Sequence, residues 1–179
     1  AERFGWRFAR DGERWRRVVP SPRPVEIVEL SIVSILLQHG VTVVCAGGGG
    51  IPVVRDAKGR ERGVEAVVDK DYASALLARQ LEADALLLLT DVASVQLDFA
   101  TPTARAIRSA SPAQLADLLA RRVFPAGSMG PKVEAACAFV EATGGFAAIG
   151  ALEDAGEVLA GRRGTRIEPG IVSLETEPV

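Results

Sequence analysis

Four short stretches of this sequence carry the residue types that hold and transfer phosphate. Glycines 47–50 form an uninterrupted run, and the chain continues with Asp69-Lys70-Asp71, Thr90-Asp91-Val92 and Gly-Ser-Met-Gly-Pro-Lys at 127–132. Bare backbone N–H groups and helix amino ends stabilise anions, and lysines neutralise a phosphoryl group in transit. The set predicts phosphoryl transfer. The sequence has a single histidine, His39, so we expect neither a histidine-based triad nor a metal site built from several histidines.

Lys70 and Lys132 stand where a cation is normally unfavourable. Each is predicted at the amino end of a helix, which is the positive end of the helix dipole. Two such lysines are explained if an anion lies between them. Each stretch also has a structural alternative, because Asp69-Lys70-Asp71 could be a solvated helix start and Thr90-Asp91 an ordinary cap at a strand end.

The glycine run is costly unless something lies close to its backbone. Each glycine in ordered structure costs roughly 0.5–1 kcal/mol in backbone entropy. The run does not match the dinucleotide fingerprint, since G-x-G-x-x-G counted from Gly47 would end on Pro52. No G-K-[ST] follows either, so it is not a P-loop. Two interpretations remain: a site that a ligand approaches, or a tight turn packed against a neighbouring helix.

Apolar runs that alternate with amphipathic segments must position these residues. Strands are predicted at residues 41–46, 85–89, 95–99, 146–150 and 165–169, and a hairpin at residues 53–68. Helices are predicted at residues 27–39, 69–84 and 152–160, from Pro112 onward, and from Pro131 to residue 143. This alternation indicates an α/β fold with a parallel sheet covered by helices on both faces. Ligands of such sheets bind at the carboxyl ends of the strands, where the polar stretches fall.

Composition narrows the class of protein. The 179 residues suffice for one domain, and the net charge of −2 gives no reason to expect nucleic acid or an anionic membrane as a partner. The longest apolar run, residues 85–89, is far shorter than the ~20 residues that span a bilayer. We expect no secretory leader and a cytoplasmic location. Cys45 and Cys137 are both expected to be buried free thiols.

The ordered motifs resemble those of carbamate kinases, in the amino acid kinase superfamily. They are WRRVVPSPRP, AGGGGIPVV, GVEAVVDKD, LLLLTDV, AGSMGPKVEAA and GTRI, spread over nearly the whole chain. The resemblance implies a three-layer α/β/α sandwich around a mostly parallel sheet, usually in a homodimer. It also implies reversible phosphoryl transfer between carbamoyl phosphate and ADP, which gives ATP and carbamate, with Mg²⁺ as the metal that accompanies ATP or ADP.

The same resemblance assigns roles to individual residues. Lys70 and Lys132 would contact the transferred phosphoryl group and the nucleotide phosphates, and Asp71 would orient both lysines. Gly47, Gly48, Gly49 and Gly50 would face carbamoyl phosphate. The nucleotide would be bound by Thr90, Asp91, Val92, Gly127, Ser128, Met129, Gly130 and Pro131.

By this resemblance, residues 1–179 are the carboxy-terminal, nucleotide-binding portion of the domain, and its amino-terminal half is missing. That half would supply a Gly-Gly-Asn loop, a further lysine and much of the dimer surface. Gln96 departs from the family, which usually has an aromatic residue there, near the nucleotide base. Two alternatives stay open: another amino acid kinase, such as an acetylglutamate, aspartate or uridylate kinase, or an inactive nucleotide-binding fragment.

Overall fold

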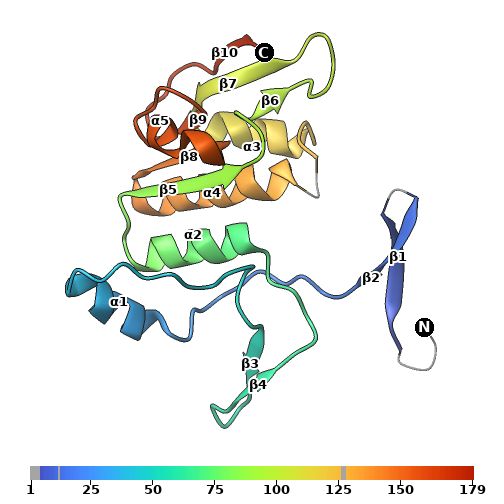
Figure 1. The fold of residues 1–179 in the computed structure, drawn as a ribbon, viewed down its shortest axis with the longest axis vertical. Coiled ribbons are helices and arrows are strands. Elements are labelled where there is room, and N and C mark those ends of the chain that lie inside the picture. Colours follow the sequence, from blue (N-terminus) through green and yellow to red (C-terminus); the bar gives the residue numbers. More distant parts are fainter. Residues whose placement is uncertain (1–4, 12, 126–127) are drawn as a thin grey trace.

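The computed structural model describes residues 5–11, 13–125 and 128–179 (Figure 1). Its strands are β1 (Arg7–Asp11), β2 (Arg14–Val18), β3 (Val53–Arg55), β4 (Glu61–Gly63), β5 (Ala85–Thr90), β6 (Gln96–Leu97), β7 (Arg105–Ala110), β8 (Phe146–Ala151), β9 (Thr165–Ile167) and β10 (Glu175–Pro178). Its helices are α1 (Leu30–Gln38), α2 (Lys70–Gln80), α3 (Pro112–Ala120), α4 (Met129–Thr143) and α5 (Ala155–Leu159), with a 3-10 turn at Leu152–Asp154.

A mixed sheet forms the centre of the molecule. Its strand order is β10-β7-β9-β8-β5, and β6 pairs with β7. The β5–β8 and β7–β9 pairs are parallel, and the other pairs are antiparallel. The α/β class predicted from the sequence is therefore confirmed. The parallel register between β5 and β8 runs over six residue pairs and ends with Thr90 beside Ala151, so these two strands finish together at one edge.

Helices cover the sheet because its central strands are apolar on both faces. Along β8, Ala147 and Ile149 belong to the main core with α4, and both are fully buried. On the opposite face, Val158 of α5 lies against Gly150, where an added Cβ would come within 2.6 Å of the valine Cγ2. Helix α2 packs on α4, and α3 packs on α4 as well. Figure 1 shows α2, α4 and the sheet as successive levels of the main body.

The helix boundaries follow from local chemistry. Ser111 and Gln114 form the expected capping box at the start of α3, with Pro112 in the first turn. Gly144 ends α4 in the left-handed conformation, at φ 72°. Helix α4 begins at Met129, two residues before the predicted start at Pro131. Proline tolerates any position of the first turn, so it does not fix the first residue.

The strand predicted at residues 41–46 is wrong. These residues form no strand in the described structure, although their composition is β-branched and apolar. A strand exists only through hydrogen bonds to a neighbour, and no described strand pairs with this segment. Val44 is 97% exposed, and Cys45 is exposed as well, so the expected burial of Cys45 is also wrong. Cys137 is buried as predicted, and both thiols are free.

Residues 5–68 project from the main body as two hairpins and α1 (Figure 1). The hairpin predicted at residues 53–68 is present as β3 and β4, with a turn held by the Asp56 side chain. The β1–β2 hairpin was not predicted, and neither were β7 and β10. Arginine and serine interrupt the apolar residues of β7 (RAIRSA), and β10 (ETEP) is mostly polar, so neither strand gives an apolar run. In the part of the chain that the structure describes, no helix combines the length and apolar character needed to cross a bilayer.

Candidate functional site

Two helix amino ends meet at the edge where β5 and β8 finish. Each helix precedes its strand in the chain, α2 before β5 and α4 before β8, so each helix begins near the carboxyl end of its own strand. Because the two strands are parallel and adjacent, both helix starts lie at the same edge. The positive ends of two helix dipoles therefore point toward one region, which favours a bound anion.

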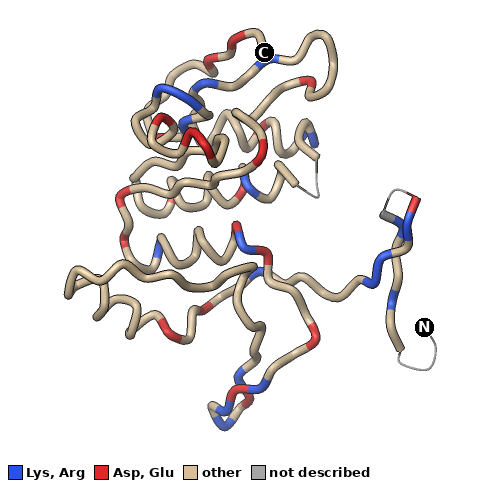
Figure 2. The backbone as a smooth tube through the Cα atoms, in the orientation of Figure 1, with Lys and Arg blue, Asp and Glu red and all other residues tan. Residues whose placement is uncertain are grey.

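Asp71 joins the two predicted lysines at this edge. Lys132 Nζ of α4 donates a hydrogen bond of 2.8 Å to Asp71 Oδ2 of α2. Lys70 Nζ lies 3.6 Å from the same carboxylate oxygen. The sequence separates Asp71 from Lys132 by 61 positions, so the fold itself brings them together. Figure 2 shows charged residues of both signs where α2 begins.

The three groups differ in their access to solvent. Asp71 and Lys132 are buried, with 4% and 8% of their surface exposed, whereas the Lys70 side chain is 55% exposed. A buried carboxylate must be paired, and here two cations share it. Asp71 thus fixes the direction of Lys132, while Lys70 keeps enough exposure to meet a ligand. This arrangement is consistent with the orienting role predicted for Asp71, which stays a prediction.

Asp69 is part of the helix rather than of the lysine cluster. Its side chain accepts a hydrogen bond of 2.7 Å from the backbone N–H of Asp71, which makes it the N-cap of α2. This cap starts the helix at Lys70 and so sets the direction of both Lys70 and Asp71. At α4, by contrast, Ser128 makes no side-chain cap within the described residues, and the first turn contains no acidic residue. Less local negative charge offsets the amino end of α4.

The glycine run lies beside the start of α2, and one glycine explains why. At Gly49, φ is +131°, and an added Cβ would lie 2.0 Å from the backbone oxygen of Val68. Gly49 is buried, whereas Gly47, Gly48 and Gly50 are exposed. No atom lies within 4 Å of a Cβ added to any of those three. The close approach at Gly49 is therefore made by the protein's own backbone, and it holds the exposed glycines next to the residues that begin α2.

The other predicted residues divide between the end of β5 and the start of α4. The Thr90 hydroxyl donates a hydrogen bond of 3.0 Å to Asp91, which is exposed, and Val92 is half-buried. Ser128 is the N-cap of α4, Gly130 is buried, and Met129 and Pro131 are half-buried. Met129 packs against the hydrophobic core. Gly127 lies outside the described residues.

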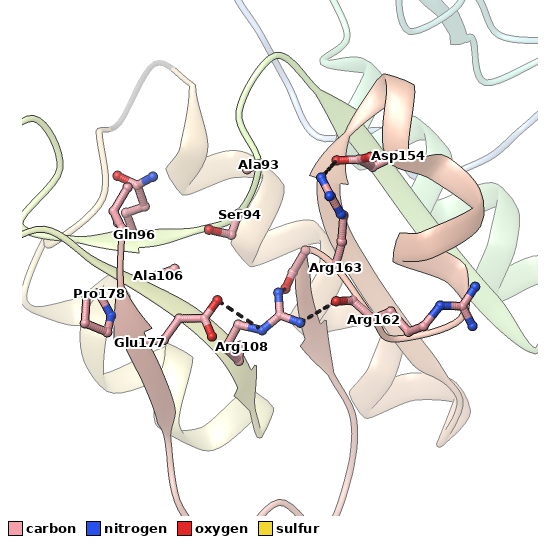
Figure 3. Close-up of a pocket in the computed structure, with 12 residues that line it drawn as sticks. Ala93, Ser94, Gln96, Ala106, Arg108, Asp154, Arg162, Arg163, Glu177 and Pro178 are labelled. Atoms are coloured by element: carbon pink, nitrogen blue, oxygen red, sulfur yellow. Dashed lines mark hydrogen bonds and ion pairs between the residues drawn. The ribbon is translucent and has the colours of Figure 1, made fainter.

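A cavity of about 440 Å³ begins just beyond the end of β5 (Figure 3). It is lined by Ala93, Ser94, Gln96, Ala106, Arg108, Asp154, Arg162, Arg163, Gly164, Glu177, Pro178 and Val179. Its volume is within the ~300–1,000 Å³ typical of small-molecule sites. Of these lining residues, sequence reasoning singled out only Gln96 for a role near the nucleotide.

Arg108 organises one wall of this cavity. Its guanidinium donates hydrogen bonds of 3.1 Å to the Gly164 carbonyl and 2.8 Å to the Arg162 carbonyl, and it lies 3.4 Å from Glu177. Arg163, another lining residue, pairs with Asp154 at 2.9 Å. Figure 3 shows these contacts among the labelled residues that line the cavity, which include Gln96. Sequence reasoning did not identify Arg108, because the two carbonyl groups that it contacts lie more than 50 residues away in the sequence.

Within residues 5–11, 13–125 and 128–179, no cluster of three or more His, Cys, Asp or Glu side chains has the arrangement of a metal site. The acidic groups at the site edge, Asp71 and Asp91, instead have lysine and threonine partners.

Comparison with known proteins places this geometry in a family context. Residues 4–149 match the model of the amino acid kinase family. The chain is 54% identical over 166 residues to the carbamate kinase of Rhizobium meliloti, covering 91% of this chain and 50% of that protein. A crystal structure from Aeropyrum pernix K1 superposes with a TM-score of 0.88 at 49% identity, covering 94% of this chain and 55% of the other.

A carbamate kinase from Giardia lamblia bound to AMP-PNP is also similar. It has a TM-score of 0.86 and 43% identity, covering 93% of this chain and 53% of that one. This chain thus spans about half the length of the curated relatives it matches.

Proposed function

Because the chain belongs to the amino acid kinase family, we propose that it forms the nucleotide-binding portion of a carbamate kinase. Such an enzyme transfers a phosphoryl group reversibly between carbamoyl phosphate and ADP. The observation that carries this proposal is the Lys70–Asp71–Lys132 cluster at two helix amino ends. Identities near 50% to carbamate kinases favour this activity over acetylglutamate, aspartate or uridylate kinase.

In the proposed reaction, the cluster supplies positioning and charge neutralisation. Lys132, directed by Asp71, would contact the group in transit, where negative charge on the equatorial oxygens must be stabilised. The more exposed Lys70 would contact the nucleotide phosphates. The exposed glycines 47, 48 and 50 would receive carbamoyl phosphate through backbone N–H groups.

The cavity beyond β5 would take the base and sugar of the nucleotide. Thr90, Asp91 and Val92 lead directly into its lining at Ala93, and Gln96 offers amide groups rather than a ring to the base. Ser128 to Pro131 at the start of α4, together with Gly127, which precedes them in the sequence, would complete the phosphate side. An amide can hydrogen-bond to the edge of a base but cannot stack as an aromatic residue does.

Magnesium fits this site as an ion carried by the nucleotide. Mg²⁺ is commonly held by one or two carboxylates together with substrate phosphates. Asp91 is an exposed carboxylate at this edge and could supply one such ligand. When bound with the nucleotide, Mg²⁺ neutralises phosphate charge. The family resemblance further leads us to propose a homodimer in the cytoplasm.

The test is ATP formation by a full-length kinase that carries these residues. We expect ATP from carbamoyl phosphate and ADP, and no phosphorylation of N-acetylglutamate, aspartate or UMP by ATP. Activity only on one of those acceptors would contradict the proposal. The 179-residue chain, assayed alone, should bind Mg-ADP without turnover. Positioning both reactants contributes about 7–11 kcal/mol to catalysis, and the chain spans half of its relatives.

A further inference from the structure

Three side chains beside the lysine cluster form a second connection between α2 and α4. The Arg23 guanidinium forms an ion pair with Glu134 of α4, and the Tyr72 hydroxyl of α2 donates a hydrogen bond to the other oxygen of the same carboxylate. Arg23 also stacks over the Tyr72 ring, 4.6 Å from its centroid. Tyr72 directly follows Asp71, and Glu134 is two residues beyond Lys132. We name these three residues the clamp.

The clamp is a mutually satisfied unit. Burial and the hydrogen bond to Glu134 raise the pKa of Tyr72 to about 12, which keeps its hydroxyl a donor. The hydrogen bonds from Tyr72 and Arg23 lower the pKa of Glu134, which keeps it a carboxylate. Tyr72 packs against the hydrophobic core, and this packing fixes the position of its ring. The Glu134 carboxylate is therefore held by the hydroxyl of the packed Tyr72 ring and by the Arg23 guanidinium.

The clamp also reaches a third segment. Arg23 lies in the extended stretch between β2 and α1, which carries the β1–β2 hairpin shown in Figure 1. The backbone of this stretch accepts a hydrogen bond of 3.0 Å at Pro20 from Val67, two residues before the N-cap of α2. The clamp thus fixes the two helix starts and the base of the hairpin together.

We propose that Arg23, Tyr72 and Glu134 are positioning residues that set the separation of α2 and α4, and so the geometry of the Asp71–Lys132 pair. That pair is one 2.8 Å hydrogen bond between two helices, and the clamp is attached within two residues of each partner. Misplacing a catalytic group by about 1 Å can reduce the rate on the order of 10²-fold. As a statement about catalysis, the proposal rests on the proposed kinase function.

The kinetic test uses Tyr72→Phe, Glu134→Gln and Arg23→Ala in the full-length kinase. Each should lower kcat about tenfold and leave KM for ADP within about twofold, because the clamp touches neither reactant in the proposed site. Arg23→Lys should recover part of the loss. The matched control is Arg55→Ala, which removes the hydrogen bonds of Arg55 in β3 to Glu61 in β4 and to Glu26 before α1, and it should leave kcat unchanged.

A spectroscopic test in the 179-residue chain is independent of turnover. Tyr72 is the only tyrosine in the sequence, so fluorotyrosine labelling gives one ¹⁹F resonance that reports the clamp. Addition of Mg-ADP should shift this resonance in the unmodified chain, and Lys132→Ala should abolish the shift. Glu134→Gln should move the resonance before any ligand is added, whereas Arg55→Ala should not.

The outcomes separate the two proposals. A wild-type enzyme that forms no ATP would overturn the kinase function, and the fluorine shift would still decide the clamp. An active enzyme whose three clamp variants keep kcat within twofold would overturn the clamp alone. A fluorine resonance that ignores Mg-ADP, in a chain shown by calorimetry to bind it, would overturn the clamp as well.

Discussion

Residues 5–68 and residues 69–179 respond differently to similar sequence signals. The apolar stretch 85–90 forms β5, paired with β8 along its whole length. The equally β-prone stretch 41–46 forms no strand, and Val44 is almost fully exposed. In the second region the described structure provides a neighbouring strand for 85–90, and in the first region it provides none for 41–46. Composition creates a tendency to form a strand, but hydrogen-bonding partners decide whether the strand exists.

The candidate site lies where these two regions meet. Gly49 belongs to the first region and packs on Val68, immediately before α2 opens the second. The lysine cluster belongs wholly to the second region, and the clamp joins both through Arg23. We therefore expect changes in the second region to affect folding and catalysis strongly. Changes in the first region should act mainly through these few contacts.

Replacing Lys132 should have the largest effect. Lys132→Ala in a full-length kinase should lower kcat on the order of 10²–10⁴-fold, because a cation directed at the transferred group is lost. Lys70, 3.6 Å from Asp71, remains to pair the buried carboxylate, which limits the loss of folding. Steady-state kinetics per folded molecule, with circular dichroism as the folding control, measure this effect. Turnover near that of the wild type would remove Lys132 from the mechanism.

Equivalent truncations in the two regions should differ in their cost to stability. Ile149→Ala removes a side chain that is fully buried in the core and should cost about 2–5 kcal/mol of unfolding free energy. Ile32→Ala changes a side chain of α1 that is 58% exposed and should cost well under half as much. Urea denaturation of both variants makes the comparison. Equal losses would show that α1 is packed as tightly as the sheet.

Adjacent glycines should also behave differently. Gly49→Ala places a Cβ 2.0 Å from the Val68 oxygen at a φ of +131°, so the loop must move away from α2. The strain of such a backbone position is on the order of 1–3 kcal/mol, and kinase activity should fall with it. Gly48→Ala meets no atom within 4 Å and is the matched control for folding. Thermal unfolding and kinase assays of the two variants measure this difference. Gly49→Ala should lower both the melting temperature and the activity more than Gly48→Ala does, and equal losses would contradict the prediction.

The two cysteines offer the mildest test of the comparison. Cys45 is exposed in the first region, whereas burial raises the pKa of the Cys137 thiol to about 12. Under native conditions a thiol reagent should modify Cys45 rapidly and Cys137 only on unfolding. Because the folded pKa of Cys137 is raised, its contribution to stability is complete below its ordinary value of 9.0 and is lost as pH rises toward about 12. Mass spectrometry of the modified peptides identifies which cysteine reacts, and simultaneous labelling of both would contradict the assignment.

The sequence predicted local chemistry well and long-range pairing poorly. The capping box at Ser111, the strand predicted at 85–89 and the terminal glycine of α4 depend on neighbouring residues, and the structure confirms them. Arginine and serine interrupt the apolar residues of β7, and only its pairing with β9, β10 and β6 reveals it as a strand. The burial predicted for Cys45 was wrong for the same reason, since it assumed a strand neighbour.

The site was predictable as a set of residues but not as an arrangement. The placement of Lys70 and Lys132 at helix amino ends follows from sequence, as does the resemblance to carbamate kinases. The shared contact of both lysines with Asp71 is consistent with the predicted orienting role, which stays a prediction. The cavity wall built by Arg108 and the clamp on Glu134 depend on contacts between distant segments. No local pattern in the sequence identifies those partners.

The most direct test of the central claim, that the Asp71–Lys132 edge holds nucleotide phosphates, is calorimetric titration of the 179-residue chain. Mg-ADP should bind with one site per chain, and adenosine, which lacks phosphates, should bind at least about tenfold more weakly. Lys132→Ala should lose at least about tenfold in affinity for Mg-ADP while keeping its affinity for adenosine. Equal affinity of the wild type and of a folded Lys132→Ala variant for Mg-ADP would contradict the account.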